Sequence, residues 1–516
     1  MQELPIGVQD FSLLRKENLL YVDKTSRLLE LVSSGRRYFL SRPRRFGKSL
    51  TLSTLEAMFQ GKQHLFAGLQ AETWVNEQAQ HPCPVLRLDI STCEHETADI
   101  FKQSLQDMLS RLARRFQITL HSQTISGQLQ DLIEEIFNRH GYAVVLIDEY
   151  DKPILDSISD LDQAEQLRSI LRSFYTTLKG CDEYLRFVML TGISKFSKAG
   201  VFSALNNLED ISLDAKFSDI VGYTQTELEL CFNDHINKAA QTLQLTREHF
   251  LERLKGYYDG FSFDGQIKLY NPFSIMQCLK KAAFNNYWYE SGSPSFIVDY
   301  LKQHQIEEPE NYRHTAVKDD FISSQDIERA DPCSFLFQSG YLTIEKKEEH
   351  LLTLDFPNRE VLDSLSSMYL KLIYKVESYA VLGNEIWAAL RQGDIAEMVR
   401  LYNIALAAVP YDDFSRHQNE SWYRSLFIML LRGAGIIAYS EPHTSKGRAD
   451  VIIQFEQQIV ILEFKYAAAS EEVARKRTEG EKQLLEREYA KTYNSEERHV
   501  ITAVIVADAE KRQAIL

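Results

Sequence analysis

The chain has 516 residues, of which 44% are hydrophobic and 25% are charged, and its formal net charge is −15. This composition is typical of globular domains and excludes extensive disorder, and the length predicts two to four domains. The acidic net charge excludes a protein that coats nucleic acid over its whole surface, so any such contact requires a local basic groove.

The first 220 residues alternate helical patterns with short apolar runs, which predicts an α/β domain with a parallel sheet covered by helices. From 221 to 410 helical periodicity dominates, so we expect a mostly helical middle region with one small strand pair. The segment 411–516 predicts a third domain of α/β type. The expected strands are Tyr38–Leu40, Val85–Ile90, Ala143–Ile147, Phe187–Leu190, Gly340–Ile344, Leu351–Phe356 and Val500–Val506.

Cysteine usage and apolar patterning bear on location. The six cysteines are scattered and contain no CxxC pair, which indicates free buried thiols in a reducing compartment. The N-terminus lacks the basic and apolar blocks of a signal peptide. The longest apolar stretch, Leu426–Tyr439, contains Arg432 and is too short to span a bilayer. We therefore expect a cytoplasmic protein without a membrane segment.

A candidate phosphate-binding loop follows the first expected strand and precedes a helical run; it consists of Ser41-Arg42-Pro43-Arg44-Arg45-Phe46-Gly47-Lys48-Ser49. Backbone N–H groups of such a loop and the helix N-terminus hold phosphates. We assign residues 44–49 to ATP binding, with Lys48 neutralising the terminal phosphates and the Ser49 hydroxyl binding Mg²⁺. Because Arg42 replaces the first glycine of GxxxxGK[ST], a basic turn that caps a helix is the alternative. Arg44 and Arg45 either contact phosphate or are solvated.

The strand Ala143–Ile147 ends in Asp148-Glu149-Tyr150-Asp151, about 100 residues after Lys48. We expect this strand beside the loop strand, with Asp148 orienting Mg²⁺ and Glu149 polarising the attacking water. The alternative is an ordinary strand followed by a polar turn, and the pairing with the loop favours the ATPase interpretation. Thr191, at the end of the next strand, is either a sensor of the terminal phosphate or a structural turn residue.

The loop and the acidic strand end resemble those of bacterial AAA-ATPase-like proteins. The resemblance covers about the first 220 residues and implies ATP binding; in that family an arginine at the position of Arg42 is usual. The resemblance would place Tyr21–Thr25 near the nucleotide base, but a plain helix cap at Thr25 is the favoured interpretation. The matching segments are Leu4–Phe11, Tyr21–Thr25, the loop itself, Asp148–Asp151, Thr191–Ile193 and Asn206–Leu208, and the resemblance continues more weakly to Tyr257–Phe261 and Tyr270–Phe273.

A second group of charged residues lies near the end of the chain, where Asp450 leads into one apolar strand and Ile459–Lys465 forms the next. If Gln457-Gln458 is a two-residue hairpin turn, Asp450 lies opposite Lys465, and Glu463 lies diagonally on the same face. Two carboxylates, Asp450 and Glu463, hold Mg²⁺ or Mn²⁺ through hard oxygen contacts, and the metal activates water. Lys465 would orient that water or stabilise the transition state. A surface salt-bridge patch is the alternative.

Two helices flank this group in the sequence. On the later one, Gln483 and Arg487 share a face and would contact a phosphate or a base, with Tyr489 close by. On the earlier one, Glu420 would supply a third carboxylate, although a solvated helix start is the favoured interpretation.

The C-terminal stretch resembles the PD-(D/E)XK nuclease superfamily through Gly447-Arg448-Ala449-Asp450 and Glu463-Phe464-Lys465. The resemblance implies a restriction-endonuclease-like domain with catalytic roles for Asp450, Glu463, Lys465 and Gln483. The chain is thus expected to be an ATP-binding, ATP-regulated, metal-dependent nuclease, with DNA favoured as substrate and defence or mobile-element control as its role. The alternatives are a nucleotide-switched nucleic-acid-binding or signalling protein with an inactive nuclease fold, and a scaffold with a vestigial ATPase. A homo-oligomer is compatible with the sequence.

Overall fold

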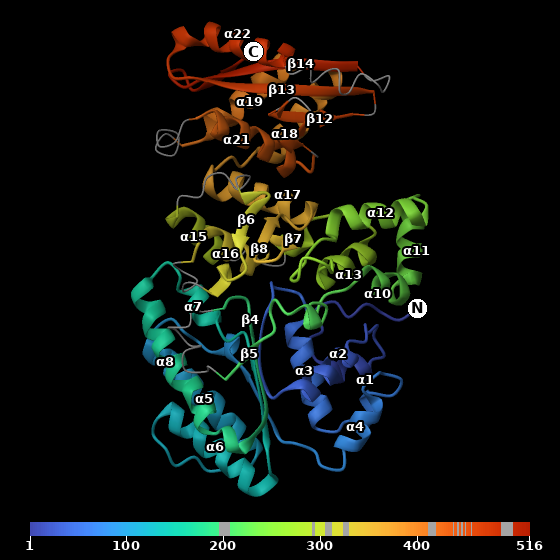
Figure 1. The fold of residues 1–516 in the computed structure, drawn as a ribbon, viewed down its shortest axis with the longest axis vertical. Coiled ribbons are helices and arrows are strands. Elements are labelled where there is room, and N and C mark those ends of the chain that lie inside the picture. The colour runs from blue at the N-terminus through green and yellow to red at the C-terminus, as the bar shows by residue number, and fades with distance from the viewer. Residues whose placement is uncertain are drawn as a thin grey trace. The chain divides into compact units, whose positions relative to one another are not determined.

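A computed structural model describes most of the chain (Figure 1). By internal contacts the chain forms two compact units, Met1–Tyr300 with Tyr312–Glu360, and Leu301–Asn311 with Val361–Leu516. The division at 220 and 410 stays a prediction. The described residues are 1–195, 207–290, 295–304, 312–323, 330–410, 419–436, 438–440, 443–444, 447–448, 450–455, 457–486 and 499–516.

The first unit contains the expected parallel sheet, and it has five strands in the order β2-β3-β4-β1-β5. The four expected strands of this sheet are confirmed. Each is an apolar run that is buried on both faces of the sheet, which is why the sequence pattern predicted it. The expectation that the acidic strand lies beside the loop strand is wrong, since β4 separates β3 from β1. The strands are β1 (Arg37–Ser41), β2 (Val85–Asp89), β3 (Ala143–Asp148), β4 (Leu185–Gly192) and β5 (Glu209–Asp210).

Helices cover both faces of this sheet (Figure 1). One face carries α1 (Phe11–Lys16), α2 (Thr25–Ser34), α3 (Lys48–Phe59) and α4 (Glu72–Gln78). The other carries α5 (Ala98–Arg115), α6 (Ile125–His140), α7 (Lys152–Asp156) and α8 (Leu161–Gly180). The helices α5, α6 and α8 begin at side-chain caps, as in α5, where the Thr97 hydroxyl accepts from the N–H of Ile100. Caps of this kind and one apolar stripe per helix explain why these three segments are helical.

The rest of the first unit is mostly helical, as expected, and it packs on the N-terminal segment of the chain. One apolar core joins Leu20 and Val22 to Phe232, Phe250 and Tyr258. The expected strand pair is present as β7 and β8, and β6 extends it to three antiparallel strands in the order β6-β8-β7. The elements are α10 (Gln225–Cys231), α11 (Asn233–Thr242), α12 (Arg247–Tyr258), α13 (Pro272–Lys281), α14 (Tyr287–Glu290), α15 (Ser295–Gln303), α16 (Pro332–Ser339), β6 (Thr315–Lys318), β7 (Thr343–Glu348) and β8 (Leu351–Asp355).

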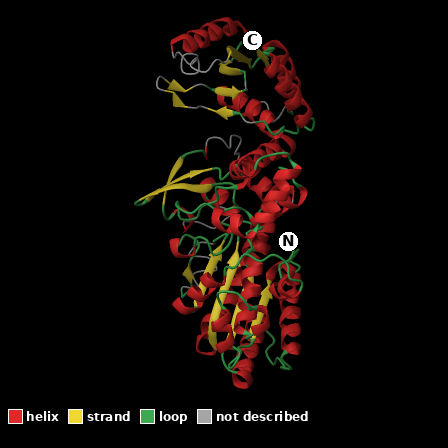
Figure 2. Cartoon of the chain, turned by 90° about the vertical axis from the view of Figure 1, so that its right-hand side faces the viewer, coloured by secondary structure: helices red, strands yellow, loops and turns green. Residues whose placement is uncertain are grey.

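The second unit contains a mixed five-stranded sheet in the order β15-β14-β13-β12-β9, in which only β13 and β14 run parallel. Helix α22 lies on one face, and α18, α19 and α21 lie on the other (Figures 1 and 2). The strands are β9 (Tyr439–Ser440), β12 (Val451–Gln454), β13 (Gln458–Ala467), β14 (His499–Asp508) and β15 (Gln513–Ile515), with a separate pair β10 (His443–Thr444) and β11 (Gly447–Arg448). The helices are α17 (Arg359–Met368), α18 (Tyr379–Gln392), α19 (Ile395–Ala408), α21 (Glu420–Gly433) and α22 (Val473–Glu486).

The predicted register between β12 and β13 is wrong by two residues. Val451 pairs with Leu462, which puts Asp450 across from Glu463 rather than across from Lys465. Gln458 is already part of β13, because a Gln-Gln pair has no preference for the positive φ angles of a two-residue hairpin turn. A shift of two residues preserves the side-chain face, so Asp450, Glu463 and Lys465 still share one side of the sheet.

Two expectations about the whole chain can be compared with the structure. All six cysteines are free thiols, and five of them are buried. Within the described residues, no helix combines the length and the apolar character that a membrane crossing requires.

Candidate functional site

The loop between β1 and α3 adopts the backbone shape of a phosphate-binding loop. Arg45 and Gly47 have positive φ angles of 66° and 98°, and α3 begins directly afterwards at Lys48. A left-handed residue is most easily a glycine, which accounts for Gly47 just before the helix. The N–H groups at the start of α3 therefore face the space in front of the loop.

Arg42, which stands where the general motif has a glycine, is a buried anchor of this loop. Its guanidinium donates to the carbonyl oxygens of Ser41 at 2.9 Å and Ser212 at 2.6 Å, and it lies 3.9 Å from the centre of the Phe263 ring. Burial lowers the pKa of Arg42 to about 9. The arginine thus ties the start of the loop to the segment after β5.

Lys48 is buried and folds back onto its own loop. Its ammonium donates to the carbonyl oxygens of Arg42 at 2.9 Å and Pro43 at 3.0 Å. Burial lowers the pKa of Lys48, and the neighbouring carboxylates, Glu149 foremost, oppose that shift. A phosphate that binds here has to replace two neutral carbonyl partners with a charged one, which a buried ammonium favours.

Asp148 and Thr191 meet at the carboxyl ends of the neighbouring strands β3 and β4. The Thr191 hydroxyl donates to Asp148 Oδ1 at 2.7 Å, and both side chains are buried. On its other side Asp148 lies 3.9 Å from the guanidinium of Arg87, which also donates to the carbonyl of Ser49 at 3.2 Å. Arg87 had not been singled out in the sequence, because an arginine within a strand carries no local signal of such a role.

Glu149 and Asp151 complete the acidic strand end. Glu149 has a positive φ of 46°, and burial raises its pKa, with Asp148 and Asp151 adding to the shift and Lys48 opposing it. Asp151 is buried and accepts hydrogen bonds from the N–H of Ile193 at 2.9 Å and from the N–H and hydroxyl of Ser194 at 2.6 and 2.7 Å. This carboxylate therefore shapes the chain just after β4.

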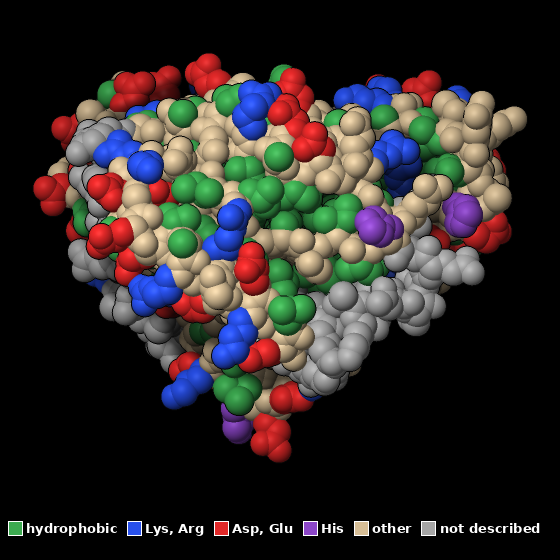
Figure 3. Space-filling model, turned by 90° about the horizontal axis from the view of Figure 1, so that it is seen from above, with side chains coloured by type: hydrophobic (Ala, Val, Ile, Leu, Met, Phe, Trp, Pro, Cys, Tyr) green, Lys and Arg blue, Asp and Glu red, His purple; other side chains and the backbone are tan. Residues whose placement is uncertain are grey.

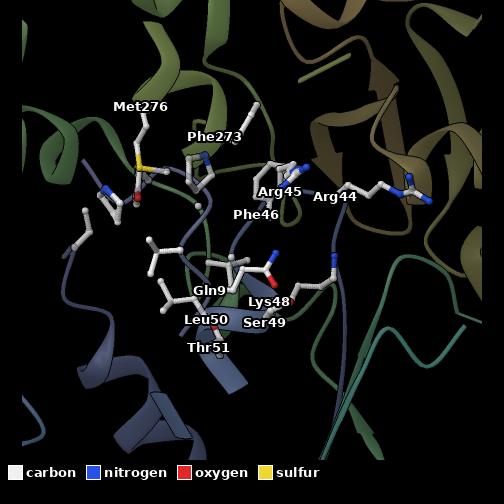
Figure 4. A pocket seen from close by; sticks show the side chains of 18 of the residues that line it. Gln9, Arg44, Arg45, Phe46, Lys48, Ser49, Leu50, Thr51, Phe273 and Met276 are labelled. Atoms are coloured by element: carbon white, nitrogen blue, oxygen red, sulfur yellow. The ribbon is translucent and has the colours of Figure 1, made fainter. Parts of the chain in front are cut away.

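A cavity of about 350 Å³ lies in front of the loop. Figure 4 shows Lys48 and Ser49 at one end of this cavity, and Phe273 and Met276 at the other. All of residues 44–49 and Glu149 line it, as do Tyr21, Lys152 and Trp288. Tyr21 of the segment Tyr21–Thr25 thus lies at the cavity, whereas the expected helix cap at Thr25 is wrong, since Thr25 is already the first residue of α2 and Lys24 is its cap residue. The contributions of Lys152, Met276 and Trp288 were missed, and only Lys152 had a local signal, since it directly follows the acidic strand end.

The middle of the loop is held by aromatic residues of the helical region. The Phe46 ring packs edge-on against Phe261 with their ring centres 4.9 Å apart, so the helical region holds this side chain in place in the cavity wall. Arg45 lies 4.9 Å from the centre of the Phe273 ring. The carbonyl oxygen of Arg44 accepts from the indole N–H of Trp288 at 3.3 Å, and the Arg44 side chain extends away from Lys48 in Figure 4.

In the second unit, Asp450 is engaged through both carboxylate oxygens. Oδ2 accepts from the N–H of Phe464 at 2.7 Å, and Oδ1 accepts from the guanidinium of Arg424 at 3.0 Å. Arg424 belongs to α21 and was missed in the sequence, because a single arginine on a helix has no distinctive pattern. Phe464 turns to the other face of the sheet, where its ring lies 5.7 Å from that of Phe427.

Lys465 joins two further carboxylates. Its ammonium donates to Glu463 Oε1 at 2.9 Å and lies 3.6 Å from Glu420 Oε1. Burial would lower the pKa of Lys465, but the contact with Glu463 and the charges of Glu420 and Asp450 outweigh it, so the pKa is raised. Burial and the nearby Asp450 raise the pKa of Glu420. Glu420 is the first residue of α21 and its side chain is 40% exposed, as the favoured interpretation of a solvated helix start predicts, but it also lies beside the charged cluster.

Helix α22 covers this cluster. A Cβ placed on Gly480 would lie 3.3 Å from Cγ of Lys465, so the helix comes very close to the lysine. Gln483 lies one turn further along α22 and is half-buried, although its role as a substrate contact stays a prediction. Ala449, Arg487 and Tyr489 lie outside the described residues.

The donor sets fit the groups that the sequence implied. Three carboxylates beside one lysine supply the hard oxygen ligands that a divalent ion prefers. The Ser49 hydroxyl, Asp148 and the start of α3 supply the contacts that a magnesium nucleotide needs.

Comparisons with known proteins identify the families of the two domains that contain these residues. Residues 5–202 match the family model described as a predicted AAA-ATPase, and residues 418–515 match that of the PD-(D/E)XK nuclease superfamily. A protein of Azotobacter chroococcum mcd 1, named as an uncharacterized protein in the vnfD 5' region, is 33% identical over 475 residues, which are 90% of this chain and 89% of that protein. The structure of the Aeropyrum pernix ORC1 protein in complex with DNA covers 83% of this chain and 88% of its own, with 10% identity and a TM-score of 0.27, which is too distant to support an inference.

Proposed function

Because the chain joins a segment of the predicted AAA-ATPase family, 5–202, to one of the PD-(D/E)XK nuclease superfamily, 418–515, we propose that it is an ATP-regulated, metal-dependent nuclease. The observation that carries this proposal is the convergence of Asp450, Glu463 and Lys465 on one face of the second sheet, joined there by Glu420. Buried charges that are costly for folding are retained where they are paired or bind a metal.

At the nuclease site, the carboxylates of Asp450, Glu463 and Glu420 would hold Mg²⁺ or Mn²⁺. A divalent ion in such a site activates water and stabilises the charge that develops on a phosphodiester. Lys465 stays protonated because its pKa is raised, so it orients the attacking water or neutralises the phosphate. Gln483 on α22 would contact the nucleic acid beside the scissile bond.

At the nucleotide site, Lys48 and the start of α3 would bind the phosphates of ATP, and Ser49 with Asp148 would hold Mg²⁺. The raised pKa of Glu149 makes its carboxylate a stronger base, so it polarises the attacking water more effectively. Thr191 fixes the orientation of Asp148 through the 2.7 Å hydrogen bond and so couples β4 to the metal position. The apolar end of the cavity, with Phe273 and Met276, would take the base.

DNA is the favoured substrate, and defence or control of mobile elements is the setting that such a fusion suggests. Figure 3 shows acidic and basic side chains interspersed over the visible face, and the net charge is −15, so contact with nucleic acid is expected to be local. The free thiols suit the reducing cytosol.

The test is a cleavage panel on single- and double-stranded DNA and RNA, with ATP, ADP or no nucleotide, in Mg²⁺ and in Mn²⁺. We expect cleavage that requires the metal, changes with the nucleotide, and is lost in Asp450→Asn and Lys465→Ala. Lys482→Ala is the matched control, since that lysine of α22 is 73% exposed and Lys465 is 6% exposed. Lys48→Ala should lose binding of labelled ATP and the effect of ATP on cleavage.

The outcomes separate the hypotheses. Absence of cleavage under every condition, with ATP binding and nucleic-acid binding retained, would favour the nucleotide-switched binding protein with an inactive nuclease fold. Absence of ATP binding in the unmodified protein would favour the scaffold with a vestigial ATPase. Cleavage that is the same with and without ATP would refute the regulatory part alone.

A further inference from the structure

Helix α21 presents two charged side chains, one turn apart, to the nuclease site. Glu420 and Arg424 are four residues apart, so they lie on the same face of the helix. Glu420 lies 3.6 Å from Lys465, and Arg424 lies 3.0 Å from Asp450. Helix α21 therefore supplies one candidate metal ligand, Glu420, and one cation, Arg424, which contacts a second candidate ligand, Asp450.

Asp450 has no oxygen left without a close partner in this arrangement. The N–H of Phe464 takes Oδ2 at 2.7 Å, and the Arg424 guanidinium takes Oδ1 at 3.0 Å. The pair is shielded from water, since the two side chains are only 15% and 12% exposed. The backbone N–H on Oδ2 leaves Oδ1 for a metal, whereas the guanidinium on Oδ1 occupies one of the two lone pairs of that oxygen, and its positive charge repels the ion.

The charge balance of the cluster also indicates that Arg424 opposes the binding of a metal ion. The cluster holds three carboxylates, Asp450, Glu463 and Glu420, and two cations, Lys465 and Arg424, which gives a net charge of −1. Without the arginine the net charge is −2, which matches a divalent ion. Lys465 is tied to Glu463 and Glu420, so Arg424 is the cation whose departure exposes an oxygen of Asp450.

We infer that Arg424 is a positioning residue that holds Asp450 in the metal-free state and must leave it when a divalent ion binds. This inference rests on the proposed nuclease function. The displaced guanidinium stays on α21 beside the site, where a phosphate oxygen of the nucleic acid offers it a new charged partner. Arg424 thus makes metal binding weaker in the free protein and links it to the arrival of substrate.

The test measures Mn²⁺ binding to the full-length protein without nucleic acid, by electron paramagnetic resonance of the free ion at low ionic strength. Removing a unit positive charge next to a divalent ion in a partly buried site should tighten binding by about tenfold or more in Arg424→Met. Arg424→Lys keeps the charge and should stay close to the unmodified protein. Asp450→Asn should abolish the site, which identifies the ion that is measured.

Arg400→Met is the matched control, because Arg400 pairs with Glu397 at 2.7 Å on α19 in the same unit and is 60% exposed. It should leave Mn²⁺ affinity unchanged. A purely structural salt bridge predicts the opposite pattern, in which Arg424→Met lowers the unfolding temperature and binds Mn²⁺ equally or more weakly; that result overturns the inference. If neither the unmodified protein nor Arg424→Met binds Mn²⁺, the proposed metal site itself fails, and the inference fails with it.

Discussion

Asp151 offers the sharpest test of how the nucleotide site is built. The carboxylate is buried and accepts three hydrogen bonds, from the N–H of Ile193 and from the N–H and hydroxyl of Ser194. Asp151→Ala leaves these donors buried without an acceptor, at about 1–3 kcal/mol each. Because the three donors share one acceptor, their costs are not additive, and we expect a total of about 3–5 kcal/mol.

Asp151→Asn should be much milder. The amide oxygen still accepts, and burial raises the pKa of Asp151, so the charge that asparagine removes is itself costly in this place. We expect a loss of about 1 kcal/mol for this variant. Asp99→Ala is the exposed control in the same unit, since the side chain of Asp99 on α5 is 93% exposed.

The assay is calorimetric unfolding of the full chain. The transition of the first unit is identified as the one that ATP shifts upward, because a ligand stabilises the unit that binds it. At about 2 °C per kcal/mol for a unit of this size, Asp151→Ala should lower that transition by about 6–10 °C. ATP affinity should fall as well, since Ile193 lines the cavity. A shift within about 2 °C for the alanine variant, or equal shifts for alanine and asparagine, would refute the reasoning.

Three further predictions concern other parts of the chain. Thr191→Val removes the hydroxyl that donates to Asp148 at 2.7 Å, so phosphate release should slow by about tenfold or more while equilibrium ATP binding changes little; unchanged turnover would contradict this. In Gly480→Ala, the new Cβ would lie 2.6 Å from a methyl carbon of β14, so we expect the second unit to lose about 1–3 kcal/mol in denaturant unfolding, whereas a gain would show that α22 is not in close contact. The hydrogen bond from His95 to Asp156 raises the pKa of His95 in the folded protein. The pair therefore stabilises the folded state fully at pH values below the pKa of an unfolded histidine, and this stabilisation is lost as the pH rises through the pKa of His95 in the folded state. The difference in unfolding temperature between His95→Gln and the unmodified protein should be largest near about pH 6 and absent by about pH 9, and a pH-independent difference would be evidence against the pair.

The strands were predictable because each is an apolar run, but their order was not. Alternation of strands and helices predicts a parallel sheet and leaves open which strands are neighbours. We expected the strand ending in Asp148 beside the loop strand, and β4 lies between them. The neighbour relation depends on where a helical crossover returns to the sheet, and no local pattern of residues records that.

The prediction that Asp450, Glu463 and Lys465 share one side of the sheet held although the predicted register was wrong. Side chains alternate along a strand with a period of two, so the two-residue error left Asp450 on the side of Lys465. The sequence contained no signal for Arg424, and for Glu420 it favoured a solvated helix start over a third carboxylate. Both come from a helix that precedes Asp450, and a charged residue at the start of a helix is usually solvated.

The nucleotide site shows the same division between local and long-range information. Lys48, Ser49 and Asp148 occur in short patterns with a known mechanism, so the sequence alone could propose them as candidates. The role of Asp151 depends on contacts with a segment 42 and 43 residues further along, and that of Arg87 on its position in a neighbouring strand. Arg87 stabilises the site without belonging to any motif, and the motif that contains Asp151 does not record which segment this carboxylate contacts.

Arg42 has a consequence for anyone who redesigns this chain. An engineer comparing it with the general phosphate-loop consensus would be tempted to repair position 42 to glycine. Here the guanidinium of Arg42 donates a hydrogen bond to the carbonyl oxygen of Ser212, 170 residues away. A glycine at position 42 would remove this long-range contact, and the loop and the segment around Ser212 would then move independently. Substitution of Arg42 by glycine is therefore expected to weaken phosphate binding by the loop, although it restores the consensus residue.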